Sequence, residues 1–432
     1  MVDEQFGNNL IMKKEYEILI NKVFSPEGKF NNNELKYILQ FLDSENPENE
    51  LNPWSARLEK AFSDKFNINF AIAHNSGTST LHSCLYAAGV GAGDEVIGPV
   101  QTGAWFPYVC LHQNAIPVYV DSDPDTFLMD SNKIEEKITE RTKAIIPTHM
   151  HGLTSQMDKV MEIAEKYNLY VIEDCAQSFL ATYNKKYAGT IGHMSSFSFE
   201  TKKHMTTGQG GMVLTNNENL AIKIRKHAGL GYKTLSASQG MTRLMPHEFQ
   251  NPHFKRHDTL AYNYRLSDIC AAIGLAQIED LDNKVNRRIT IANMYDQVLT
   301  NVNWIIPQKI PRNCKSSYWS YVVKYLGEEK YGISWEKFYE IYNNNGGDGF
   351  YGGLSLNTDE IFMRDKQYFG TYIPKDYYLF KNRFEDTSDN YPIAKNIQPL
   401  MMKFKTGYRD LNQAEKAVNA LKKTIQQIQN NG

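Results

Sequence analysis

The sequence predicts an α/β protein in which a mostly parallel, seven-stranded sheet is covered by helices and a smaller C-terminal α+β domain follows. From about Asn69 onward, short apolar runs alternate with helical stretches. The runs recur every 20–27 residues or roughly so, which leaves room for one helix between most pairs of strands, as βαβ units require. We expect the seven strands at residues 70–74, 95–100, 116–121, 143–149, 170–174, 196–199 and 212–216.

A different pattern follows Asn263 and predicts the second domain. Residues 267–300 read as one long helical stretch with apolar positions at helical spacing, and residues 411–429 read as an amphipathic, core-facing helix. We expect the first of these to connect the two domains. The predicted boundaries are an N-terminal helical segment at 1–60 that packs on the large domain, the large domain at 61–285 and the small domain at 286–432.

The overall composition is that of an ordinary globular protein and argues against several functional classes. Of the 432 residues, 41% are apolar and 22% are charged, and the net charge is −2. This balance gives no electrostatic reason to expect binding of nucleic acid or of a membrane surface, and no apolar run approaches the ~18–20 residues of a membrane span. The N-terminus lacks the basic region and the apolar core of a signal peptide. Five scattered cysteines without C-x-x-C spacing predict reduced thiols, a cytoplasmic location and no metal site.

Chemically suggestive residues gather between Glu173 and Gly211. The motif E-D-C-A-Q ends an apolar run, so Asp174 lies at the end of a predicted strand, and Lys203 precedes a glycine-rich turn further on. Pyridoxal phosphate chemistry needs such a pair, because the lysine forms the Schiff base and the acid keeps the pyridine nitrogen protonated. Taken alone, the motif also fits a surface aspartate that caps a strand and a solvated lysine pair.

A second motif, N-S-G-T-S-T at 75–80, follows the first predicted strand and opens a helix. Gly77 and Thr78 would offer free backbone N–H groups at the positive end of the helix dipole, which suits a phosphate. The same turn also serves as a plain helix cap without any ligand. This motif, Asp174 and Lys203 all follow strand ends, and ligands of open parallel sheets bind beyond the carboxyl ends of strands.

Several stretches in fixed order resemble one family, the DegT/StrS-type sugar aminotransferases, which are pyridoxal phosphate enzymes of fold type I related to aspartate aminotransferase. The resemblance runs from about Trp54 to Leu299 and is weaker in the small domain. The stretches that carry it are AIAHNSGTSTL (71–81), GAGDEVIGPV (91–100), AIPVYVDSDPDTFLMD (115–130), KAIIPTHMHGLTSQMD (143–158), VIEDCAQS (171–178), AGTIGHMSSFSF (188–199), TTGQGGMVLTN (206–216) and YNYRLSDICAAIGLAQIEDLD (262–282).

The resemblance implies a role for each residue around the cofactor ring. Lys203 is the lysine that binds the cofactor, Asp174 pairs with the pyridinium nitrogen, and Gln177 hydrogen-bonds the O3′ side of the ring. The spacing from the F-S-F serine and to the glycine-rich turn favours Lys203 over its neighbour Lys202. His204 is expected to be a packing residue or to support the site indirectly.

At the phosphate end, the resemblance implies contacts from Gly77, Thr78 and Ser198. Asn263, in the motif Y-N-Y-R, resembles an asparagine that reaches the phosphate in the neighbouring subunit's site. That match implies a homodimer with shared active sites.

One departure from the family pattern concerns the aromatic residue that stacks on the cofactor ring. The family usually carries it at position 103, where this chain has Gly103, and Trp105 and Phe106 follow closely. Either Trp105 stacks on the ring through a shifted backbone, or the ring face is covered in another way.

The implied activity is a ping-pong transfer of an amino group from glutamate or glutamine to a keto-sugar, most often nucleotide-linked in this family. The alternatives are a keto-cyclitol or a small phosphorylated ketone as acceptor, a sugar dehydratase, a non-enzymatic regulator, and an aldolase or lyase of the same fold. A dehydratase predicts histidine in place of Lys203, and a regulator predicts loss of the site residues. Basic residues in segment 231–262 fit either a diphosphate or carboxylate site or a solvated loop; they are Lys233, Arg243, Lys255, Arg256 and His257.

Overall fold

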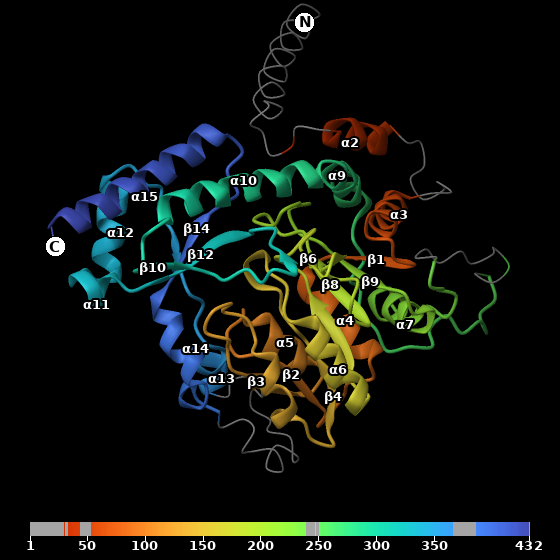
Figure 1. Ribbon diagram of the computed structural model, residues 1–432. Coiled ribbons are helices and arrows are strands. Elements are labelled where there is room, and N and C mark those ends of the chain that lie inside the picture. The colour runs from red at the N-terminus through yellow and green to blue at the C-terminus, as the bar shows by residue number, and fades with distance from the viewer. Residues whose placement is uncertain are drawn as a thin grey trace, which may run out of the picture.

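The computed structural model describes residues 30, 33–43, 53–238, 247, 250–365 and 386–431, and it shows two layered parts joined by one long helix (Figure 1). Much of the expected N-terminal segment at 1–60 lies outside these residues, as does Arg243 of the basic segment. Within the described ranges, no helix is both long enough and apolar enough to cross a membrane.

The larger part is built on a seven-stranded sheet, which confirms the predicted fold class. Its strands are β1 (Phe70–His74), β2 (Glu95–Pro99), β3 (Ile116–Val120), β4 (Thr142–Ile145), β5 (Tyr170–Asp174), β8 (Met194–Ser198) and β9 (Gly211–Thr215). They lie in the order β1-β9-β8-β5-β4-β2-β3, and within this sheet only β9 runs antiparallel to its neighbours. Each of the seven expected strands is present, with ends shifted by a few residues at most.

Helices cover both faces of this sheet because successive strand residues point to opposite sides. Ile72 of β1 packs into one apolar core, whereas Ala71 and Ala73 pack into another. The first face carries α4 (Gly77–Ala87), α5 (Trp105–His112) and α7 (Glu218–Ala228), and the second carries α3 (Trp54–Phe66), α6 (Met157–Tyr167) and α9 (Asp268–Glu279). Outside these layers, α2 (Glu34–Asp43) packs on α9, where the hydroxyl of Tyr37 donates to Glu279 at 2.6 Å.

The helical stretch predicted at 267–300 is two helices, so the expectation of one helix was wrong in this detail. Between α9 and α10 (Leu281–Leu299), Asp280 has φ −101° and ψ 8°, which interrupts the helical hydrogen-bond ladder. The apolar pattern continues across the break because both helices face cores. As predicted, α10 connects the two parts of the molecule (Figure 1).

The smaller part is an antiparallel sheet packed against helices. Its strands β10 (Ile305–Pro307), β12 (Ser320–Tyr325), β14 (Met401–Lys405) and β13 (Tyr351–Gly352) lie in that order. One face packs on α10, α12 (Trp335–Asn344) and α15 (Leu411–Asn431) through an aromatic core that includes Tyr295, Phe338 and Phe404. The predicted helix at 411–429 is the core of α15, whose apolar positions face this cluster.

The opposite face of the small sheet turns toward the large part. Val322 of β12 pairs with Lys403 of β14, and Lys403 also pairs with Tyr351 of β13, so the three side chains share one face. Val322 packs there with Phe127 of the large part. The small sheet therefore closes over the strand ends of the large one.

Short elements complete the described structure. They are the small sheet of β6 (Thr182–Tyr183), β7 (Lys186–Tyr187) and β11 (Cys314–Lys315), the helices α11 (Gly327–Tyr331), α13 (Ile361–Arg364) and α14 (Pro392–Ile397), and 3-10 turns at Ser131–Lys133, Glu135–Lys137, Met150–Gly152, Asn357–Asp359, Ser388–Asn390 and Gln398–Leu400.

Candidate active site

Asp174 lies at the carboxyl end of β5, near the centre of the large sheet, and it is 1% exposed. Its Oδ1 accepts the backbone N–H of Ala176 at 3.1 Å, and its Oδ2 accepts the indole N–H of Trp105 at 2.8 Å. Burial raises the pKa of Asp174, while these two hydrogen bonds and the charge of Lys203 oppose the rise. A carboxylate in this position is not a surface cap, and it is stabilised by any further cationic N–H donor that reaches it.

The neighbouring Glu173 holds the end of β5 in place. Its buried carboxylate accepts backbone N–H groups from Gly189 at 2.8 Å, Ile191 at 2.7 Å and Gly192 at 2.6 Å. It also accepts the Nε2–H of His149 at 3.0 Å. Burial alone would raise the pKa of Glu173, but the hydrogen bonds together hold it below its usual value.

His149, Glu173 and Cys175 bring three potential metal-ligating atoms close together. The imidazole of His149 is already used at both nitrogens, because its Nδ1 accepts the backbone N–H of Ser155 at 3.1 Å. Four N–H donors likewise occupy Glu173. The cluster therefore acts as a structural network that supports Asp174.

Lys203 follows β8 on a loop and points back toward Asp174. Its Nζ lies 5.9 Å from the ring centre of Trp105 and 5.3 Å from that of Trp319. Burial lowers the pKa of Lys203, and the charges of Asp174 and Glu200 oppose the shift. A lowered pKa increases the fraction of uncharged amine, which is the nucleophilic and basic form.

Lys202 points elsewhere. It is exposed, and its Nζ lies 5.4 Å from the ring centre of Tyr351 in the small part. His204 is buried on the other side, with its Nε2 bonded to the carbonyl of Ser317 at 3.0 Å and its ring 5.7 Å from that of Phe179. Burial lowers the pKa of His204 well below the usual value, so this ring is a neutral packing group.

The N-terminus of α4 forms a cradle beside β8. Ser76 caps the helix by accepting the backbone N–H of Ser79 at 3.1 Å, which leaves Gly77 and Thr78 in the first turn. A Cβ at Gly77 would lie 2.7 Å from the Cβ of Ser198, so only glycine lets the helix end approach the strand this closely. Backbone N–H groups and a serine hydroxyl thus converge where a phosphate is stabilised by the helix dipole.

Gln177 lies on the other side of Asp174 and is buried. Its Oε1 accepts the backbone N–H of His151 at 2.9 Å, which fixes the orientation of the amide. His151 has a left-handed backbone (φ 63°), and its ring Nδ1 lies 3.3 Å from the hydroxyl of Ser320 in β12. The small sheet therefore reaches the edge of the site.

Trp105 and Gly103 form a matched pair. A Cβ at position 103 would overlap the indole ring of Trp105, so the missing side chain makes room for the tryptophan. The indole meets Asp174 through its N–H edge. The structure places Trp105 in the site, and its stacking on a cofactor ring stays a prediction.

Asn263 is the one predicted site residue that lies apart from the others. It is exposed, accepts a hydrogen bond from Arg265 at 3.0 Å and lines a separate cavity with Ser55 and Asp268. The basic segment is also separate: the Nζ of Lys233 lies over Phe254 at 3.9 Å from the ring centre, and Lys255 is exposed.

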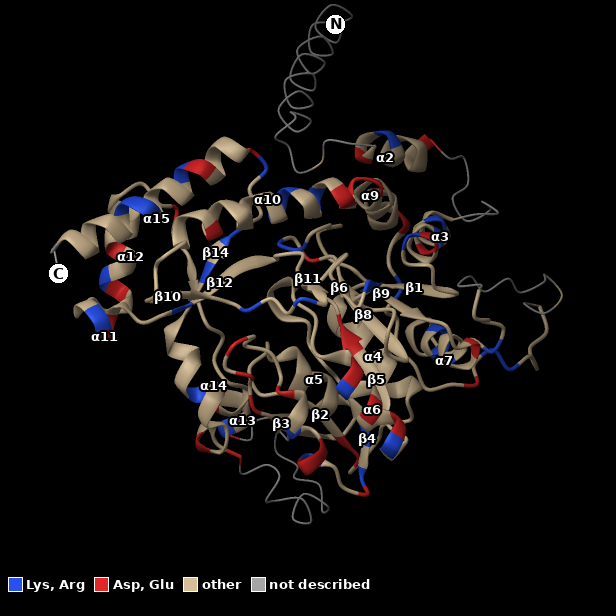
Figure 2. Ribbon diagram, viewed as in Figure 1, with Lys and Arg blue, Asp and Glu red and all other residues tan. Residues whose placement is uncertain are grey.

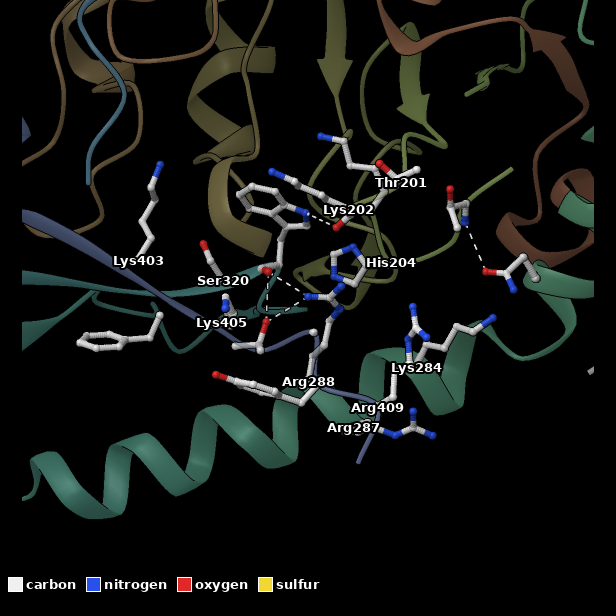
Figure 3. A pocket seen from close by; sticks show the side chains of 18 of the residues that line it. Thr201, Lys202, His204, Lys284, Arg287, Arg288, Ser320, Lys403, Lys405 and Arg409 are labelled. Carbon is white, nitrogen blue, oxygen red and sulfur yellow. Dashed lines mark hydrogen bonds between the residues drawn. The ribbon is translucent and has the colours of Figure 1, made fainter. Parts of the chain in front are cut away.

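Sequence reasoning missed a basic cavity of about 440 Å³ that adjoins Lys203 (Figure 3). Loop 201–206, α10 and the inner face of the small sheet line it, and Figure 2 marks basic residues on both α10 and β14. The basic side chains that line it are Lys202, Lys203, Lys284, Arg287, Arg288, Lys403, Lys405 and Arg409. Isolated basic residues from such distant segments leave no motif. Trp319, Ser320 and Tyr351 of the small part also line the cavity.

The residues fit pyridoxal phosphate at both ends. The cradle of Gly77, Thr78 and Ser198 would hold the phosphate, and the buried carboxylate of Asp174 would meet the ring nitrogen. Between these two ends lies the amine of Lys203, which is free of any carboxylate within ion-pair distance in the described part of the chain.

Comparisons with known proteins agree with this geometry. GDP-perosamine synthase from Caulobacter vibrioides is 38% identical over 69% of this chain and 76% of its own length. GDP-perosamine synthase from Escherichia coli O157:H7 is 37% identical over 66% and 73%, respectively. The crystal structure of an aminotransferase from Psychrobacter cryohalolentis superposes with a TM-score of 0.80 at 25% identity, covering 94% of this chain and 100% of that one.

The sequence model of one family matches residues 29–347, which is more than half of the chain. Its members share the fold type described above, and pyridoxal phosphate is the cofactor that the site residues accommodate. The chain belongs to the DegT/DnrJ/EryC1/StrS aminotransferase family and is a pyridoxal phosphate-dependent transaminase.

Proposed function

We propose that the protein transfers an amino group from glutamate or glutamine to a keto group on a nucleotide-linked sugar. The observation that carries this proposal is that the buried Asp174, the amine of Lys203 and the cradle at the N-terminus of α4 gather around the carboxyl ends of β5 and β8. The similarity to two GDP-perosamine synthases supports the choice of a nucleotide-linked acceptor. When bound, pyridoxal phosphate supplies the electron sink for the carbanion formed at the donor Cα.

Lys203 moves the proton. With its pKa lowered by burial, the uncharged amine of Lys203 would act as the general base that accepts the proton of the donor Cα. The ring centres of Trp105 and Trp319 lie 5.9 and 5.3 Å from this amine, and the two rings contribute to its desolvation. Because general bases work best with a pKa near the operating pH, desolvation of Lys203 serves the transfer directly.

Asp174 would keep the ring nitrogen of the cofactor protonated. Its carboxylate is desolvated and already oriented by Ala176 and Trp105, so a protonated ring nitrogen restores the stabilisation that burial removes. The cradle around Gly77 and Ser198 would hold the phosphate at the opposite end of the cofactor.

We also propose that the active enzyme is a homodimer in which Asn263 completes the partner's site. Asn263 lines a cavity other than the basic one beside Lys203, and large apolar side chains close to it in the sequence are exposed: Leu260 is 92%, Tyr262 is 47% and Ile269 is 40% exposed. Exposed apolar groups gathered this way are typical of a surface that another chain covers.

The donor half-reaction and the acceptor half-reaction can be tested separately. Adding glutamate or glutamine to the purified, cofactor-loaded protein should abolish the visible absorbance band of the lysine-bound cofactor. A nucleotide-linked 3-keto or 4-keto sugar should then restore the band and yield the amino sugar. Restoration by a keto-cyclitol or a small phosphorylated ketone, with nucleotide-linked sugars inert, would contradict the proposed acceptor class.

Replacing the reacting lysine should separate it from its neighbour. Lys203→Ala is expected to keep the fold but lose the lysine-bound absorbance band, and proton transfer should slow by about 10²–10⁴-fold, the usual contribution of a general base. Lys202→Ala is the matched control for the band, because the Nζ of Lys202 lies over Tyr351 rather than near Asp174, and the band should persist. Absorbance spectra and single-turnover rates check both, and the reverse pattern would show that Lys202 is the reacting lysine.

Asp174→Asn removes the charge that keeps the ring nitrogen protonated. A neutral ring is a poorer electron sink, and each ~1.4 kcal/mol of lost transition-state stabilisation slows the reaction about tenfold, so we expect a drop of about a hundredfold or more. The measurement is single-turnover conversion at saturating donor, alongside a melting curve. Turnover close to that of the wild type would remove the role assigned to Asp174.

A composite dimer predicts complementation between two defective chains. Asn263→Ala and Lys203→Ala should each be impaired alone, whereas a mixed dimer carries one intact site and regains activity. Sedimentation should give twice the chain mass of 49.6 kDa. A fully active species at the mass of one chain would refute shared sites.

A further inference from the structure

Lys403 has an unusual environment for a lysine. It lies on the face of β14 that turns toward the large part, and only 7% of it is exposed. Within the described part of the chain its ammonium group forms neither a hydrogen bond nor an ion pair. Buried lysines are normally paired, because an unpaired buried charge is costly. Consistent with this, burial lowers the pKa of Lys403 to about 8.

The cavity that Lys403 enters carries a large excess of positive charge. Eight basic side chains line it, whereas Asp280 is the one acidic residue among the described residues of its wall. Among those eight, ion pairs within 4 Å are formed in the described structure by Lys284 with Asp280 at 3.7 Å and by Lys405 with Asp348 at 2.8 Å. Figure 3 shows basic side chains of the cavity wall on three elements: the loop (Lys202), α10 (Lys284, Arg287 and Arg288) and β14 of the small sheet (Lys403 and Lys405).

The cavity wall is ordered by its own hydrogen bonds. The guanidinium of Arg288 donates to the carbonyl of Trp319 at 2.9 Å and to the hydroxyl of Thr406 at 3.1 Å, and the indole N–H of Trp319 donates to the carbonyl of Lys202 at 2.9 Å. Burial lowers the pKa of Arg288 to about 10. The hydrogen-bond partners of Arg288 are uncharged, so they hold the guanidinium in place without neutralising its positive charge. That charge remains available to a ligand.

We propose that this cavity binds the phosphate groups of the acceptor, and that Lys403 is the small-domain residue that contacts them. The proposal rests on the function proposed above and adds the site that selects a phosphorylated acceptor. A phosphate carries up to two negative charges and several acceptor oxygens, which matches a cavity with many donors and few acids. Its arrival would supply the partner that the buried Lys403 lacks.

The amino donor is smaller than this cavity. Glutamate also carries carboxylates that the cations of the wall would attract. A volume of about 440 Å³ also lies within the usual range for sites of substrates larger than an amino acid. Both ligands are anionic, so the experiment has to separate them.

The test measures binding of inorganic pyrophosphate to the cofactor-loaded enzyme by calorimetry, which requires no turnover. Lys403→Met is expected to weaken binding at least tenfold, and Lys403→Arg to remain within about threefold, because it restores the cation. Lys337→Met removes a lysine of the same domain whose side chain is 53% exposed, and it should bind like the wild type. Pyrophosphate binding by Lys403→Met equal to that of the wild type would overturn the proposal.

A second measurement distinguishes the anionic ligands and the alternative partners of Lys403. The dependence of the donor half-reaction on glutamate concentration should be unchanged in Lys403→Met, whereas a tenfold weaker response would assign Lys403 to the donor carboxylate instead. Sedimentation should show an intact dimer and melting should show no loss of stability, since the variant removes an unpaired buried charge. Dissociation of the dimer would show that Lys403 pairs with the neighbouring chain, and it would also overturn the proposal. Failure of every keto-sugar, with pyrophosphate binding still dependent on Lys403, would reject only the proposed function.

Discussion

The buried carboxylate of Glu173 is the constraint on which the rest of the site depends. Three backbone N–H groups of the loop 189–192 and the imidazole of His149 donate hydrogen bonds to it. These bonds hold the loop and the end of β5 together around one charge. Removing a partner from such a buried network leaves an unsatisfied charge, which costs several times more than a surface ion pair of about 0–1 kcal/mol. Asp174, the next residue along the chain, takes its position from this anchor.

The pKa values of three ionisable groups around the site are shifted in the direction that favours their neutral forms. Burial raises the pKa of Asp174 and lowers the pKa of Lys203 and of Lys403. The protein alone therefore holds three charged groups at a cost in stability, which ligands of matching charge would offset. Buried ionisable groups with shifted pKa values and no charged partner are typical of binding sites and unusual in structural cores, where buried charges are paired. The small domain contributes to it because the inner face of its sheet carries a lysine where an apolar residue would pack better.

The sequence predicted what depends on local pattern and failed where distant segments combine. Seven strands and the residues at their ends were recognisable because period-2 runs, glycine turns and strand-end polar groups are encoded within a few neighbouring residues. Asp280 was missed as a helix break because the apolar spacing continues across it. Lys403 and Arg288 were missed because each is a single basic residue in an unremarkable stretch. Only the packing of β14 and α10 around the loop of Lys203 brings them together.

Gly103 and Trp105 show how one substitution in a pattern is understood only with its structural partner. A carboxylate offers about four acceptor positions, and Ala176 and Trp105 occupy one on each oxygen of Asp174. Positions therefore remain for a ring nitrogen, so the indole bond and cofactor binding are compatible. Because any side chain at position 103 would overlap the indole, the glycine is required by the tryptophan. Gly103 and Trp105 are thus a coupled pair, in which the glycine makes room for an indole that donates a hydrogen bond to the acid.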